Sequence, residues 1–149
     1  MNDEHRSRNT VAQLALHAGA LSLLVVGADH LDEYALNNFS TVPTIGTLFL
    51  LNFIAATIVG AGLLLPWQRM TKRFADPVEM LFALSGIGIA AGSLIGLWIS
   101  ETSGLFGFTD YGFRATIVVA MVAELSTLVA LSVYLSLGQW HPIGRLRSH

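Results

Sequence analysis

The chain has 149 residues, of which 53% are hydrophobic and only 12% are charged, and its formal net charge is −2. A soluble domain carries about 25% charged residues. Here the apolar residues form blocks of about 20, a pattern typical of a membrane protein. The sequence contains no cysteine, which excludes disulfides, thiolate metal sites, iron–sulfur clusters and cysteine nucleophiles.

Four apolar segments are predicted to be membrane-spanning helices within a single domain, residues 1–149. Each is long enough to cross roughly 30 Å of hydrocarbon at about 1.5 Å per residue. The connections are short, so we expect an all-α, up-down bundle. A cleaved signal peptide is the alternative for the first segment. The predicted spans are Thr10–Asp29, Thr44–Pro66, Val78–Ser100 and Ala115–Leu137.

The basic residues predict the orientation of these spans. Seven of the eight Lys and Arg residues fall on one side of the predicted membrane, and only Arg114 falls on the other. Because cytoplasmic loops carry the excess of Lys and Arg, both termini are expected in the cytoplasm. At the start of the third span, Asp76 to Glu79 has the pattern of a capping box.

A carboxylate stands near the centre of the fourth span, at Glu124. A charge there costs roughly 2.5–3.5 kcal/mol, which makes Glu124 a candidate for a proton-relay or ligand-binding group. The alternative is a buried polar pair with Asn52 of the second span, which lies at similar depth and would fix the helix register. We expect a carboxyl–amide contact, or one bridging water. His17 is a third intramembrane polar residue, nearer the cytoplasm.

The expected outer face is acidic and forms a second candidate site. Oxygen-rich groups with one imidazole are able to hold a divalent cation, but the spacing matches no specific site, so a solvated loop is favoured. His17 and His30 are about 20 Å apart along one helix and cannot share a metal or haem. No metal, cofactor, catalytic constellation or nucleic-acid contact is expected. The residues of this outer candidate site are His30, Asp32, Glu33, Tyr34, Glu101 and Asp110.

Glycines recur every four residues in the third span, at Gly88, Gly92 and Gly96. Such spacing forms a flat groove that lets another helix approach closely. We expect this groove to pack within the chain against Ala56 and Gly60. The alternative is a homo-oligomer formed through the glycine face.

Several short motifs resemble those of an uncharacterised family of small four-helix integral membrane proteins from actinobacteria. The resemblance covers most of the chain and implies four spans in a bacterial plasma membrane, without implying an activity. One departure is Thr109, where the family pattern has an acidic residue directly after residues 104–108. The motifs are His30-Leu31, Tyr34, Val42-Pro43-Thr44-Ile45-Gly46, Leu48-Phe49-Leu50-Leu51-Asn52, Gly104-Leu105-Phe106-Gly107-Phe108 and Glu124.

These distinctive residues gather in the outer half of the predicted bundle. We therefore expect a non-enzymatic accessory or scaffold subunit whose outer half contacts a partner or lipid. The alternative is a small transporter or redox component that uses Glu124 as a protonatable group. That alternative requires a polar cavity that reaches Glu124.

Overall fold

The computed structural model describes residues 2–71, 73–104 and 115–138, and these are almost entirely helical, with no strand among them. Four of the helices are long and apolar enough to cross a membrane. This confirms the predicted all-α fold with four candidate spans. The elements are α1 (Asn2–Ala35), the 3₁₀ helix η1 (Phe39–Thr41), α2 (Ile45–Leu63), the short helix α3 (Trp67–Met70), α4 (Ala75–Thr102) and α5 (Ala115–Leu137).

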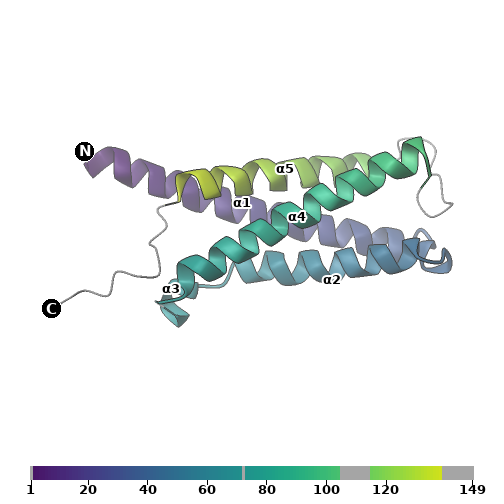
Figure 1. Ribbon diagram of the computed structural model, residues 1–149, viewed down its shortest axis with the longest axis horizontal. Helices are drawn as coiled ribbons and strands as arrows, with labels where there is room; N and C mark the ends of the chain where they lie inside the picture. Colours follow the sequence, from purple (N-terminus) through teal and green to yellow (C-terminus); the bar gives the residue numbers. More distant parts are fainter. Residues whose placement is uncertain (1, 72, 105–114, 139–149) are drawn as a thin grey trace.

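The four long helices run alternately up and down, and α4 crosses the others diagonally (Figure 1). We call the end of the bundle that holds residues 36–44 the loop end, and the end where α1 begins the terminal end. Helix α1 packs against both α2 and α5. Near the terminal end, α4 lies beside α2 and α3 and is also hydrogen-bonded to α5, and towards the loop end α4 diverges from α2 (Figure 1). The space between α2 and α4 therefore widens towards the loop end.

The core is built from small and branched apolar side chains of all four long helices. Leu23 of α1, Ala56 of α2, Ala83 of α4 and Leu131 of α5 are all completely buried. Small residues allow helices in a membrane to approach closely, and close packing replaces the hydrophobic driving force that acts in water. Helix α1 thus supplies part of the core.

The helix boundaries differ from the predicted ones mainly at α1 and α4. Helix α1 extends beyond the predicted span at both ends, and α4 begins at Ala75 with Phe74 as its N-cap residue and no side-chain cap. The predicted capping box is therefore wrong. Asp76 lies inside the first turn, where its carboxylate accepts a hydrogen bond from Gln68 (2.8 Å), and Glu79 is bonded to a tyrosine of α5.

Gly46 lies where η1 meets α2, and a side chain there would collide with the backbone carbonyl oxygen of Phe39. Because backbone cannot swing aside as a side-chain tip can, Gly46→Ala is expected to lower the free energy of unfolding by about 1–3 kcal/mol. Gly96→Ala is the matched control, since a Cβ at Gly96 would meet nothing within 4 Å. Removing that helical glycine should be neutral or stabilising by up to about 1 kcal/mol. Thermal unfolding in detergent compares the two, and equal effects would contradict the predicted collision.

Candidate functional site

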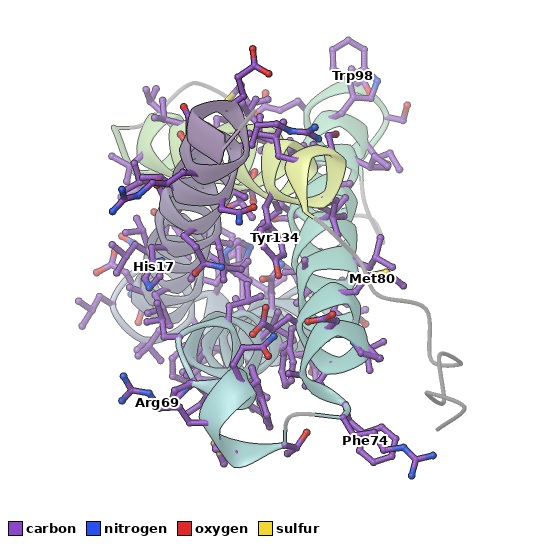
Figure 2. All side chains as sticks on the ribbon, turned by 90° about the vertical axis from the view of Figure 1, so that its left-hand side faces the viewer. His17, Arg69, Phe74, Met80, Trp98 and Tyr134 are labelled. Carbon is purple, nitrogen blue, oxygen red and sulfur yellow. The ribbon has the colours of Figure 1, made fainter. Side chains whose placement is uncertain are left out.

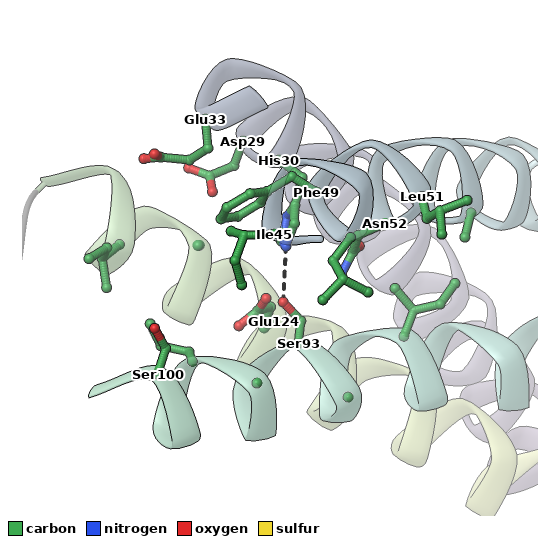
Figure 3. Close-up of a pocket in the computed structure, with 18 of the residues that line it drawn as sticks. Asp29, His30, Glu33, Ile45, Phe49, Leu51, Asn52, Ser93, Ser100 and Glu124 are labelled. Carbon is green, nitrogen blue, oxygen red and sulfur yellow. Dashed lines mark hydrogen bonds between the residues drawn. The ribbon is translucent and has the colours of Figure 1, made fainter. Parts of the chain in front are cut away.

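A cavity of about 440 Å³ opens between α2 and α4 towards the loop end, with α1 and α5 behind it. Its volume falls in the range of small-molecule sites, roughly 300–1,000 Å³. The depth of the cavity is polar and its remaining wall is mainly apolar (Figure 3). The polar lining residues are Asp29, His30, Glu33, Asn52, Ser93, Ser100 and Glu124.

His30 of α1 and Ser93 of α4 form a hydrogen-bonded pair across the bundle. The imidazole Nδ1 lies 2.9 Å from the carbonyl oxygen of Val26, one turn earlier in α1. A carbonyl only accepts, so Nδ1 carries the proton and donates to it. In the neutral ring, Nε2 is then the acceptor for the Ser93 hydroxyl, 3.1 Å away (Figure 3). This arrangement fixes the ring orientation, and His30 is only 6% exposed.

Glu124 of α5 lies in the interior of the bundle, and its side chain is only 1% exposed. Its carboxyl group lies beside the hydroxyl of Ser93 (Figure 3). Its Oε2 atom is buried and has no hydrogen-bond partner among the described residues. A carboxyl oxygen left without a donor in an apolar interior is costly, which marks Glu124 as the most unusual group in the cavity.

Asn52 of α2 borders the same cavity as Glu124 but forms no hydrogen bond with it. The side-chain carbonyl oxygen of Asn52 is buried and also lacks a partner among the described residues. The two side chains therefore form no direct carboxyl–amide hydrogen bond, and the expected alternative of one bridging water stays a prediction. Ser93 of α4 lies beside Glu124 instead.

The three regularly spaced glycines of α4 form one wall of the cavity. They do not pack against Ala56 and Gly60, as we expected. A Cβ at Gly60 would instead meet Leu24 of α1, whereas a Cβ on any of the three would meet nothing within 4 Å. The groove that these glycines form is part of the ligand-sized space. The three residues are Gly88, Gly92 and Gly96.

The mouth of the cavity faces the side of the bundle that a bilayer would surround. On α2, Leu48 is 41% exposed and Leu51 is 55% exposed, and both line the cavity. On α4, Gly88 and Gly92 are exposed lining residues. The cavity thus opens on a lateral face of the bundle, between α2 and α4.

His17 does not join the intramembrane polar site with Glu124 and Asn52. It is exposed, and its Nδ1 lies 2.7 Å from the carbonyl oxygen of Gln13 in the same helix. Viewed from the terminal end, His17 lies at the periphery of the bundle, whereas Tyr134 lies at its centre (Figure 2). The sequence gives the depth of His17 but not the direction in which it points.

The structure divides the residues of the outer candidate site. Two of them, His30 and Glu33, line the cavity. Asp32 accepts a hydrogen bond from Asn37 (3.0 Å), while Tyr34 and Glu101 are half-buried and lie outside the cavity lining. Asp110 lies outside the described residues. Within the described ranges, no three or more His, Cys, Asp or Glu side chains are grouped so that they could hold a metal ion.

Sequence analysis missed the part that Ser93 plays in this site. The only available signal was its position directly after Gly92, on the same helix as the regularly spaced glycines. Its pairing with His30, sixty-three residues earlier, depends on how α1 and α4 cross.

No protein-family model, curated protein or solved structure matches this chain.

Proposed function

We propose that this chain is a non-enzymatic, multi-pass membrane protein that binds an amphiphilic molecule from the bilayer in the cavity between α2 and α4. The observation that carries the proposal is the cavity's division into two parts. Its depth holds His30, Ser93 and Glu124, and its mouth is lined by exposed leucines of α2. A polar head and an apolar tail fit such a space, because each would meet groups of its own kind.

The proposed location is a bacterial plasma membrane, with both termini in the cytoplasm and the loop end outside. The unequal distribution of Lys and Arg along the sequence supports this orientation, and the resemblance to actinobacterial membrane proteins supports the compartment. The cavity would then lie in the outer half of the bundle. Binding a lipid or lipid-like molecule there agrees with an accessory role in which the outer half makes the contacts.

Gly92→Leu tests this proposal, because the leucine side chain would occupy part of the cavity next to the glycine wall of α4. A Cβ at Gly92 meets no other atom within 4 Å, so the larger side chain is expected to leave the fold intact. It should reduce the binding of a twelve-carbon amphiphile by at least about ten-fold, because the ligand loses its space. The measurement is native mass spectrometry of the full chain in a neutral detergent, titrated with dodecanol.

The matched control is Ile95→Leu, also on α4, where the side chain is 59% exposed and does not line the cavity. This variant should bind dodecanol as the wild type does. Equal binding by Gly92→Leu and the wild type would refute the cavity as the site. A change in oligomeric state on Gly92→Leu, without a change in dodecanol binding, would instead assign the glycine face to contact between two copies of the chain.

A second candidate function is a small transporter or redox component that uses Glu124 as a protonatable group. The cavity favours it, because a buried carboxyl is useful for transport only when a ligand or proton is able to reach it. The completely buried Leu23 and Leu131 lie among the core residues of the bundle. Transport would require this packed layer to open. The test is transport of an amphiphile across the membrane of proteoliposomes that contain the full chain. Transport by the wild type that is abolished in Glu124→Gln would support this candidate over simple binding.

A further inference from the structure

Two buried oxygen atoms in the cavity lining lack a hydrogen-bond donor among the described residues. Glu124 Oε2 and Asn52 Oδ1 are both buried and lack a donor among the described residues, and both residues line the cavity. The Ser93 hydroxyl is already placed against His30, whose Nδ1 proton is donated to Val26. A ligand that satisfies these two oxygen atoms must therefore bring donors of its own.

The charge of the lining favours a cation over an anion. Among the described lining residues there are three carboxyl side chains, at Asp29, Glu33 and Glu124, and no Lys or Arg. Asp29 and Glu33 take part in other interactions, whereas Glu124 Oε2 has no partner among the described residues. A buried carboxylate is costly unless a positive group pairs with it and donates hydrogen bonds.

An aromatic ring also stands at the polar end of the cavity. Phe49 lines the cavity, with its ring centroid 5.4 Å from that of His30. The face of an aromatic ring attracts a cation but gives no such preference to a neutral hydroxyl. Phe49 thus adds to the preference that Glu124 sets.

We propose that the ligand of this cavity carries an alkylammonium group, which donates hydrogen bonds to the Glu124 carboxylate and the Asn52 carbonyl oxygen. The apolar body of the ligand would lie along the leucines of α2 and the glycine wall of α4. This inference rests on the proposed function, since it names the class of amphiphile that the cavity takes. A free lipophilic amine and a phospholipid with an ethanolamine head offer the same ammonium chemistry.

The test compares three probes with the same twelve-carbon tail on the full chain in a neutral maltoside detergent. Dodecylammonium has charge and N–H donors, dodecyltrimethylammonium has charge alone, and dodecanol has a neutral donor. We expect dodecylammonium to bind at least about ten-fold more tightly than dodecanol, as a hydrogen bond to a charged group implies. Dodecyltrimethylammonium should lie between them, because it lacks N–H donors.

Glu124→Gln is expected to reduce the preference for dodecylammonium over dodecanol to less than about three-fold, while dodecanol binding is retained. Retained dodecanol binding shows that the variant is folded. Asn52→Leu is the second variant and should weaken dodecylammonium more than dodecyltrimethylammonium, because only the former donates to the lost carbonyl. The exposed His17→Gln is the control and should change none of the three affinities.

Equal binding of dodecylammonium and dodecanol by the wild type would overturn the ammonium proposal and leave the amphiphile cavity standing. Persistence of the preference in Glu124→Gln would overturn it as well. Failure of all three probes to bind would refute the proposed function itself. Competition by phosphatidylethanolamine but not phosphatidylcholine in nanodiscs would identify a lipid head as the source of the ammonium, and no competition would identify a free amine.

Discussion

Replacing Leu131 with alanine is expected to lower the free energy of unfolding by about 2–3 kcal/mol. Leu131 is completely buried, and its side chain fills the space between two glycines on neighbouring helices. A Cβ at Gly19 of α1 would lie 2.5 Å from Leu131 Cδ2, and a Cβ at Gly86 of α4 would lie 2.7 Å from Cδ1. Truncation therefore leaves a void that three helices share.

The size of this effect is set by the packing contacts that are lost when a side chain is truncated in the core of a bundle surrounded by lipid. Leu→Ala in soluble cores costs about 2–5 kcal/mol, which combines transfer from water with the cavity left behind. Unfolded helices stay in lipid, so lost packing accounts for most of the cost here, and the lower part of the range applies. Val129→Ala on the same helix, where the side chain is 66% exposed, should cost less than about 0.5 kcal/mol. Unfolding by denaturant in mixed micelles measures both, and similar values would contradict the proposed packing of Leu131.

Tyr134→Phe is expected to lower the free energy of unfolding by about 1–3 kcal/mol. The Tyr134 hydroxyl donates to Glu79 Oε2 at 2.8 Å, joining α5 to α4. Tyr134 is 3% exposed and Glu79 is 9% exposed. Removing the hydroxyl leaves a buried carboxyl oxygen without this donor, and the cost of desolvating that oxygen is no longer offset.

A double-mutant cycle isolates this hydrogen bond from other effects. In a Glu79→Leu background the acceptor is absent, so adding Tyr134→Phe should cost less than about 0.5 kcal/mol. Ser136→Ala is the control for loss of a hydroxyl on α5, because Ser136 is exposed and only bonds the Ser132 carbonyl of its own helix. An undiminished cost of Tyr134→Phe in the Glu79→Leu background would show that the hydrogen bond is not its cause.

The number of spans and their helical structure were predictable because a span is a local property. A run of about 20 apolar residues is enough to identify it, and the backbone in hydrocarbon must satisfy its own hydrogen bonds, which favours a helix. The fourth span was predicted with the bounds that α5 has in the structure, Ala115–Leu137. The start of α4 was not, because the cap signal at Asp76 competes with a hydrogen bond from Gln68.

The sequence alone also determined that Glu124 is unusual, because a carboxylate within an apolar span is costly wherever it points. Which groups surround it depended on how the helices cross. The diagonal course of α4 brings Ser93, not Asn52, beside Glu124 and turns the glycines towards a cavity instead of a partner helix. Helix crossing is set by the summed packing of many side chains far apart in the chain, so no local pattern specifies it, and only the tertiary structure brings these residues together around one cavity.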